Sequence, residues 1–446
     1  MSTEIKKPGK TFSVFDGVAV VIGIVIGAGI FKFPTLIAWN VSSGGEIALV
    51  WLLGGFISFV GALCYAELST TYPDAGGDYY FLSKAYGSKL SFVFAWTRMM
   101  IIQPGSIVMM AFIVGDELSR IIPLGKISDS LYAFIIVALL TGLNIAGIKK
   151  CNMAQKTLTV AIIAGLAVIF LLGFFVASPS TAPLPEAIPS GETMSKFGMA
   201  MVFVLLTFGG WNEAAYISSE VKQEKNIVKS LLIGISVITV IYLLVNFALY
   251  RTLGIEGMRD FNAYQKVVEQ TLGRNFTPFI SLLIIVAALS TTNVTIITGA
   301  RSNYALGRDY SLFKFLGYWN SRTEAPTRAL VFQGIISFFL IFMGTFYKSG
   351  LESMVDYTSP AFWFFFLLAG ISLFVLRLKN PQKNRPFNVP LYPFTPVLFI
   401  LFCVYMLRSS LLYTGKGAVV SVIVMITGVV ALFVDNHLKK KRERLT

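Results

Sequence analysis

Long apolar stretches recur along the whole chain, and they fix the solvent in which it folds. A helix that crosses the hydrocarbon core of a bilayer needs about 20 mostly apolar residues. Barrel strands are excluded, because they alternate apolar with polar residues, whereas these stretches are apolar throughout. We therefore predict an all-α integral membrane protein with about twelve transmembrane helices, one for each stretch. The stretches cover residues 17–39, 47–69, 92–114, 131–148, 157–176, 197–219, 231–250, 279–304, 330–346, 355–376, 391–412 and 418–434.

The basic residues indicate the orientation of the chain in the membrane rather than a nucleic-acid partner. The formal net charge is +14, but only 13% of the residues are charged, against about a quarter in soluble domains. With the amino terminus in the cytoplasm, roughly 25 of the 37 Lys and Arg residues fall in cytoplasmic segments and roughly 10 in external ones. We expect a multi-pass protein of the cell membrane, in contact with the lipid bilayer, with both termini cytoplasmic and no bound nucleic acid.

Two of the predicted helices are interrupted near the centre of the membrane. The first contains Gly23, Gly27 and Gly29, and each glycine inside a helix costs about 1 kcal/mol relative to alanine. The sixth contains Thr207-Phe-Gly-Gly-Trp-Asn, which ends in a good helix N-cap residue, Asn212. Close helix packing is the alternative explanation for each glycine cluster alone. Paired breaks in matching positions favour a binding site instead.

Unwound backbone at membrane depth is tolerated only where it lines a cavity, and paired breaks are typical of a site between two inverted repeats. If the repeats cover about 13–177 and 197–378, each break falls in the first helix of its repeat. The N-terminus of a half-helix offers unpaired N–H groups and a positive dipole end to an anion. A carboxylate suits that end, whereas freed carbonyls suit an ammonium group.

With these motifs in place, the chain resembles the amino acid/polyamine/organocation (APC) superfamily, and within it the L-type amino acid transporters and their bacterial relatives. The resemblance covers nearly the whole chain, and five motifs follow one another in the family's order. They are Gly27-Ala-Gly-Ile-Phe in the first helix; Tyr65-Ala-Glu-Leu and Tyr72-Pro-Asp-Ala-Gly-Gly-Asp-Tyr at the end of the second; Phe208-Gly-Gly-Trp-Asn in the sixth; Asn293 and then Arg301 to Asp309 in the eighth; and Leu376-Arg-Leu-Lys-Asn-Pro with Arg385-Pro-Phe-Asn-Val-Pro-Leu-Tyr-Pro after the tenth.

The resemblance implies a LeuT-like fold with a five-plus-five inverted repeat and two extra helices over about 391–436, all in one membrane domain, 1–446. It implies secondary active transport of amino acids by alternating access, as a permease or an antiporter, without a cofactor. Animal relatives of this type often pair with a glycoprotein through a cysteine between helices three and four. Residues 115–130 contain no cysteine, so no covalent glycoprotein subunit is expected, and the oligomeric state stays open.

The resemblance also places the substrate. Its carboxylate would meet first-helix amides around Ala28 and Gly29, and its amino group would meet carbonyls near the two breaks, at Ile24, Val25, Leu206 and Phe208. The candidate substrate-binding residues are Ile24, Val25, Gly27, Ala28, Gly29, Leu206, Thr207, Phe208, Gly209 and Asn212.

Three further positions bear on ion coupling and gating. Ser290 and Thr291 lie where sodium-coupled proteins of the wider fold place hydroxyl ligands, so they form a candidate Na⁺ site of the oxygen type. The alternative is that they bond to neighbouring backbone. Leu206 stands where many relatives have an aromatic gate, and Ile162 stands where many carry a lysine that braces the unwound first helix. Aromatic closure at position 206 and proton coupling through such a lysine are therefore not expected.

Ionisable residues at membrane depth cost about 2.5 to 3.5 kcal/mol on insertion scales, so each needs an explanation. The candidates are Arg98, Glu67 and Glu213. Glu213 either complements the dipole of the half-helix after the break or binds a cationic substrate. The partner of Arg98 cannot be identified from the sequence.

Other classes of function fit less well. The only histidine is His437, and the sequence has no His-Glu-x-x-His, Gly-x-Ser-x-Gly or Walker loop, so no catalytic residue and no enzyme is expected. Cys64, Cys151 and Cys403 are too far apart to suggest a metal site. A channel would need a filter or a ring of charges.

The residues near the two breaks are apolar apart from Thr207 and Asn212. We therefore expect a neutral amino acid as the substrate. A cationic amino acid or a polyamine, bound through Glu213, is the alternative.

Overall fold

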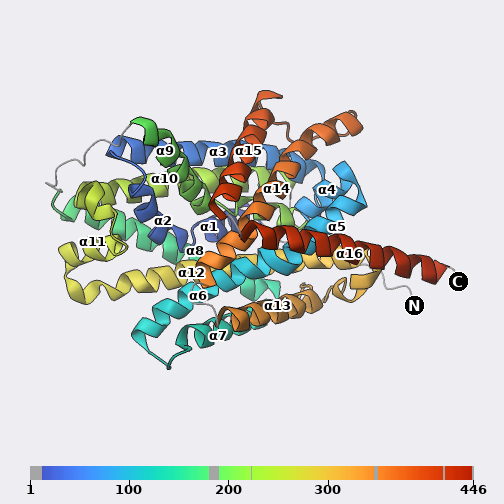
Figure 1. Cartoon of the computed structure of the whole chain (residues 1–446), viewed down its shortest axis with the longest axis horizontal. Helices are drawn as coiled ribbons and strands as arrows, with labels where there is room; N and C mark the ends of the chain where they lie inside the picture. The colour runs from blue at the N-terminus through green and yellow to red at the C-terminus, as the bar shows by residue number, and fades with distance from the viewer. Residues whose placement is uncertain (1–12, 180–189, 222, 346–349, 415–416, 444–446) are drawn as a thin grey trace.

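The computed structural model describes residues 13–179, 190–221, 223–345, 350–414 and 417–443. Within these ranges most of the chain is helical, and most helices run along the long axis of the molecule (Figure 1). Eleven described helices are long and apolar enough to cross a membrane, and a bent pair, α1 and α2, makes a twelfth span. Each of the twelve predicted stretches coincides with one of these spans. The prediction of an all-α protein with about twelve transmembrane helices is confirmed.

The element order is as follows. The first part of the chain contains α1 (Val14–Val25), α2 (Gly29–Ala38), α3 (Gly44–Thr71), α4 (Asp78–Tyr86), α5 (Ser88–Thr97), the π-helical η1 (Arg98–Ile102), α6 (Gln103–Ile121), α7 (Ser128–Ile145), α8 (Ile148–Leu171) and the π-helical η2 (Leu172–Val176). The second part contains α9 (Ser190–Thr207), the 3₁₀-helical η3 (Trp211–Glu220), α10 (Glu224–Met258), α11 (Ala263–Leu272), η4 (Arg274–Phe276), α12 (Pro278–Asp309), η5 (Ser311–Leu316), α13 (Thr327–Thr345), α14 (Gly350–Lys379), α15 (Phe394–Thr414) and α16 (Gly417–Glu443).

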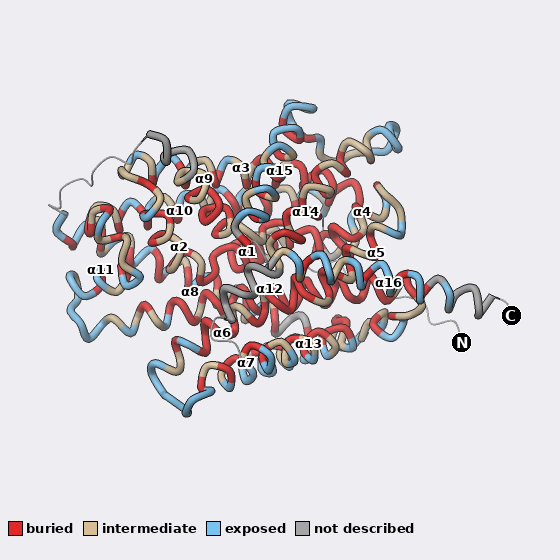
Figure 2. The backbone as a smooth tube through the Cα atoms, in the orientation of Figure 1, coloured by how far each residue is buried: buried red, intermediate tan, exposed pale blue. Residues whose placement is uncertain are grey.

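The outer helices turn apolar side chains outward, as a lipid solvent requires. Leu139 on α7 is 64% exposed and Phe433 on α16 is 70% exposed. Figure 2 shows buried residues at the centre of the bundle and exposed ones along its edges and ends. An apolar surface of this extent is rare on a soluble monomer, so the bilayer must cover it.

The two central helices, α1 and α12, position the candidate site. Every residue of α1 from Ala19 to Val25 is buried, and three quarters of the residues of α12 are buried. α1 packs against α8, α10 and α12. The short helices α4 and α11 lie at opposite ends of the long axis (Figure 1). A break in α1 therefore opens backbone groups in the middle of the protein, surrounded by three other helices.

Candidate functional site

The first feature of the candidate site is the break in the first span. α1 ends at Val25, α2 begins at Gly29, and the two helices are bent by 48°. The Gly27 N–H donates to the Val25 carbonyl. Among the described residues, no backbone carbonyl accepts a hydrogen bond from the N–H groups of Ala28, Gly29 or Ile30, because the first turn of a helix has no preceding turn to supply one. These three donors lie at the positive end of α2, which suits an anion.

The second feature is the break in the sixth span. α9 ends at Thr207 and η3 begins at Trp211. Gly210, between them, has a φ of 107°, a left-handed conformation that favours glycine. A Cβ atom on Gly210 would lie 3.1 Å from Cγ1 of Ile24 in α1. The two predicted breaks are therefore present and lie against each other.

Asn212 does not cap the half-helix that follows this break, so that prediction is wrong. The N-cap residue of η3 is Gly210, and it makes no side-chain hydrogen bond. The left-handed turn at Gly210 already reverses the chain, and Asn212 instead donates to Asp78 of α4 at 3.4 Å.

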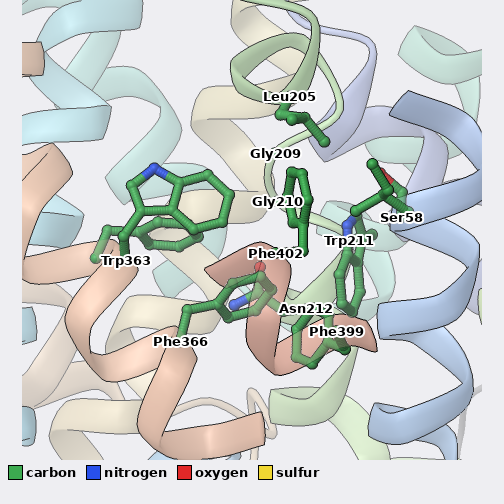
Figure 3. A pocket seen from close by; sticks show the side chains of 12 residues that line it. Ser58, Leu205, Gly209, Gly210, Trp211, Asn212, Trp363, Phe366, Phe399 and Phe402 are labelled. Atoms are coloured by element: carbon green, nitrogen blue, oxygen red, sulfur yellow. The ribbon is translucent and has the colours of Figure 1, made fainter. Parts of the chain in front are cut away.

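Asn212 also lines a small cavity among aromatic side chains such as Trp363 and Phe366 (Figure 3). That cavity measures about 20 Å³, enough for one water molecule but not for an amino acid.

Tyr242 of α10 joins the two breaks, and the sequence analysis missed it. Its hydroxyl oxygen lies 3.0 Å from the carbonyl oxygen of Val25 and 3.2 Å from that of Thr207. The ring is buried and packs edge-on against Trp51 and Phe208. A buried tyrosine hydroxyl needs a partner, so a tyrosine inside the largely apolar run 237–245 of α10 was the available signal.

Phe33 of α2 stands beside Gly29. A Cβ atom on Gly29 would lie 3.1 Å from two atoms of the Phe33 ring and 3.8 Å from Cγ2 of Thr207. The Phe33 ring stacks on Phe203 of α9, with 6.0 Å between the ring centres. Leu206 is half-buried and packs against the same core cluster as Phe33. An aromatic ring next to the first break thus comes from position 33, which the sequence analysis did not single out.

Ser290 and Thr291 of α12 are hydrogen-bonded to carbonyls of α1. The Ser290 hydroxyl donates to the Gly23 carbonyl at 3.0 Å, and the Thr291 hydroxyl lies 3.2 Å from that oxygen and 3.3 Å from the Ile24 carbonyl. Nε2 of Gln155 in α8 donates to the Ser290 hydroxyl at 2.7 Å. A Cβ atom on Gly23 would lie 1.9 Å from that nitrogen. A side chain at position 23 would therefore displace the Gln155 amide from its place beside Ser290.

Neutral polar contacts, not a positive charge at position 162, connect α8 to the first helix. Ile162 of α8 is buried in the apolar core, which suits an uncharged side chain. The polar tie between α8 and the first helix comes instead from Gln155 and from Thr159, whose hydroxyl donates to the Ala19 carbonyl at 3.1 Å. Gln155 is held in turn by Asn293, which donates to its carbonyl oxygen at 2.9 Å. The described hydrogen bonds between α8, α12 and the first helix are thus made by neutral amide and hydroxyl groups.

Arg98 and Glu213 form a buried ion pair, which identifies the partner that the sequence left open. Nη2 of Arg98 lies 2.5 Å from Oε2 of Glu213, and the two side chains are 2% and 7% exposed. Gln103 donates to the same carboxylate oxygen at 3.1 Å. The guanidinium carbon lies 4.0 Å from the centre of the Tyr216 ring. The charge of Glu213 is therefore compensated within the protein.

Glu67, the third ionisable candidate, serves to join helix ends. Its carboxylate accepts two hydrogen bonds from Arg377 at the end of α14 and one from the backbone N–H of Val389. Arg385 lies 3.5 Å away. Glu67 thus ties the end of α3 to α14 and to the loop that follows it, away from both breaks.

The sequence is similar to that of known proteins along nearly its whole length. The sequence matches the amino acid permease family over residues 12–434. Similar proteins include the b(0,+)-type amino acid transporter 1 of Rattus norvegicus, which is 26% identical over 98% of this chain and 91% of its own length. The cystine/glutamate transporter of Homo sapiens is 26% identical, over 94% and 83%. The serine/threonine exchanger SteT of Bacillus subtilis (strain 168) is 25% identical, over 96% and 97%.

These relatives are transporters and exchangers rather than enzymes, so the resemblance deduced from the motifs is confirmed. The match spans both broken helices and every described membrane span. The chain therefore belongs to the amino acid permease family, whose members are membrane transporters of amino acids.

Proposed function

We propose that the protein exchanges neutral amino acids across the cell membrane by alternating access, with the substrate bound between the two breaks. The observation that carries this proposal is the facing pair of broken helices, with three N–H groups at the start of α2 that have no backbone acceptor. Those groups would hold the substrate carboxylate. Carbonyls at the breaks would accept from its ammonium group, although the Ile24 and Val25 oxygens already accept one side-chain hydrogen bond each.

The pairing of Glu213 supports a neutral rather than a cationic substrate. A cationic side chain would need an acidic partner, and Glu213 is the carboxylate nearest the second break in the sequence. Arg98 and Gln103 already occupy it, and breaking a buried ion pair costs about 3 to 5 kcal/mol. Removing Arg98 from Glu213 to admit a cation is therefore unfavourable.

The proposed cycle does not use Na⁺. A cation at Ser290 and Thr291 would need their hydroxyl oxygens and the α1 carbonyls as ligands. Both hydroxyls donate to those carbonyls, and Gln155 donates to Ser290. A hydrogen-bonded amide already fills the role that a bound cation would have in holding the unwound helix.

The architecture proposed for this cycle consists of two inverted repeats, at about 13–177 and 197–378, with α15 and α16 outside them. Both termini are proposed to be cytoplasmic; residues 1–12 and 444–446 lie outside the described residues. We further propose that the chain works without a covalently attached glycoprotein subunit, because residues 115–130 offer no cysteine for one.

Reconstitution of the purified chain alone in liposomes tests these proposals together. Uptake of a panel of neutral, cationic and acidic amino acids would be measured with and without Na⁺ and a pH gradient. We expect neutral substrates to be taken up without Na⁺ and to be stimulated by unlabelled substrate on the opposite side. A preference for lysine or arginine would favour the cationic alternative, and flux without trans-stimulation would indicate a channel.

Tyr242→Phe should slow exchange by about twofold to tenfold. The hydroxyl is the shared donor to one carbonyl of each broken helix, and a lost buried hydrogen bond costs about 0.5 to 1.5 kcal/mol, which corresponds to about tenfold in rate at most. Initial rates in proteoliposomes measure the effect. Tyr86→Phe is the matched control, since its hydroxyl donates to the Leu368 carbonyl, outside both breaks. Equal slowing in both variants would contradict a role for Tyr242 at the breaks.

Leu206→Phe should change the size preference. A phenylalanine would add apolar area near the proposed substrate, worth about 25 cal/mol per Å² buried, and would narrow the space for a large side chain. We expect the ratio of transport efficiencies for alanine over leucine to rise about tenfold, the lower end of what one methylene group is worth in a hydrophobic pocket. An unchanged ratio would show that position 206 does not face the substrate.

A further inference from the structure

A second group of buried polar atoms lies on the side of η3 that faces α4. Asp78, the first residue of α4, is 5% exposed. Its Oδ2 atom accepts from Tyr216 at 3.2 Å and from Asn212 at 3.4 Å, both residues of η3. Its Oδ1 atom has no partner among the described residues.

Other buried atoms around this carboxyl are also without partners. Among the described residues, no hydrogen bond is made by Nε of Arg98 or Oδ1 of Asn212. Each of these side chains is at most 2% exposed. Unsatisfied buried polar groups are rare and costly, so several in one place indicate a site where a proton, a water molecule or an alternative pairing is accommodated.

The charges of this group do not balance. Arg98 supplies one positive charge, and Glu213 and Asp78 supply two carboxyl groups. Glu213 is ion-paired to Arg98 at 2.5 Å, whereas no described basic residue forms an ion pair with Asp78. With both carboxyl groups ionised the group would carry an uncompensated buried negative charge, which is strongly unfavourable. One bound proton makes it neutral.

The surroundings favour binding of this proton to Asp78 rather than to Glu213. Asp78 belongs to α4, which is not among the helices that span the membrane. Burial raises the pKa of Asp78 from 3.8 to about 6; the Glu213 charge adds to the rise, while Arg98, Tyr65 and Tyr216 oppose it. Two basic residues on the helices that pack against α4 are directed to other places than Asp78. Lys379 of α14 donates to the Ala85 carbonyl, and Lys89 of α5 is exposed.

We propose that Asp78 binds and releases a proton and thereby controls how strongly α4 and Arg98 are attached to η3. This attachment in turn sets the rate of the amino acid exchange proposed above. With the proton bound, the group is neutral and Arg98 stays on Glu213. When the carboxyl gives its proton to water, the carboxylate attracts the unpartnered Nε of Arg98 and repels Glu213. The attachment of η3, which continues from the second break, is then weakened.

The direction of the pH effect follows from the raised pKa. When η3 is released and Asp78 is solvated, its pKa returns to about 3.9. Between pH 4 and 6 the closed arrangement binds the extra proton, so its stability falls as the pH rises through this range and is constant above it. The pKa of Asp78 differs by about two units between the closed and the released arrangement, and about one of these units lies within the range from pH 5 to pH 7.5. Raising the pH across this range therefore shifts the equilibrium between the two arrangements about tenfold toward release.

The first test measures thermal denaturation of the full chain in detergent, without substrate, from pH 5 to pH 7.5. Asp78→Asn mimics the neutral carboxyl, so its melting temperature should lie above that of the wild type at pH 7.5, and the difference should shrink by about 1 to 2 °C at pH 5. His437→Gln controls for the only histidine of the sequence and should behave as wild type. A difference that does not change with pH would overturn the proposal.

The second test measures exchange in proteoliposomes with equal pH on both sides. Wild type should exchange about tenfold more slowly at pH 5 than at pH 7.5, and Asp78→Asn should be slow and nearly independent of pH. If the variant keeps the wild-type pH dependence, Asp78 is not the site. The proposal rests on the proposed exchange function, but the denaturation experiment uses no substrate. Absence of all amino acid uptake would refute the exchange function. The pH dependence of the difference in melting temperature would still show whether Asp78 binds the proton.

Discussion

Gly29→Val should reduce amino acid uptake by at least about 100-fold while the protein still inserts and folds. The first Cβ atom alone would lie 3.1 Å from the Phe33 ring and 3.8 Å from Thr207, and the two methyl groups of valine would extend into the space beside the amides of Ala28 and Gly29. Loss of a single preorganised donor costs about 2.7 to 4 kcal/mol where charge is bound, or about 100-fold or more. Initial uptake rates, normalised to reconstituted protein, measure the effect.

Gly142→Val is the matched control for this change. Gly142 lies in α7, and a Cβ atom there would meet nothing within 4 Å. Both variants replace a glycine of a membrane helix by the same β-branched residue, so a general effect of valine on membrane insertion would appear in both. Normal uptake and affinity in Gly29→Val would show that the α2 amides do not bind the carboxylate. Gly29→Ala should fall between the two, because only the Phe33 ring must move.

The sequence was sufficient to predict the spans and the breaks, because both follow from local rules that the membrane enforces. A stretch of about 20 apolar residues has few alternatives to a spanning helix. Likewise, glycines at positions 27, 29, 209 and 210 have no reason to gather at mid-membrane unless backbone must bend or approach closely. The predicted breaks are therefore found where they were expected, between Val25 and Gly29 and between Thr207 and Trp211.

The partners across the bundle could not be predicted, because they depend on how distant segments meet. Arg98 and Glu213 are separated by 115 positions in the chain, and Gln155 and Ser290 by 135. No periodicity relates such pairs. The error at Asn212 has a similar origin: its propensity to cap a helix is real, but the left-handed turn at Gly210 had already ended the break.

Arg98→Met should destabilise the protein more than any other single change considered. Removal of the guanidinium leaves Glu213, whose side chain is 7% exposed, as an unpaired buried charge, and also removes the positive charge nearest to Asp78. Breaking a buried ion pair in this way costs about 3 to 5 kcal/mol. The free energy of unfolding in mixed micelles should fall by that amount, and uptake should be lost with it.

The double variant Arg98→Met with Glu213→Gln separates the ion pair from the packing of the two side chains. Without the carboxylate, no buried charge is left unpaired when Arg98 is replaced. Gln103 can still donate to the new amide oxygen, as it does to the carboxylate at 3.1 Å. A neutral pair of similar volume is often as stable as the ion pair it replaces, so the double variant should recover most of the loss. The coupling energy from the cycle should lie at the upper end of the usual range, about 3 kcal/mol. If the two single effects simply add, the stabilising partner of Arg98 is not Glu213, and the neutral character of the proposed substrate would lose its main support.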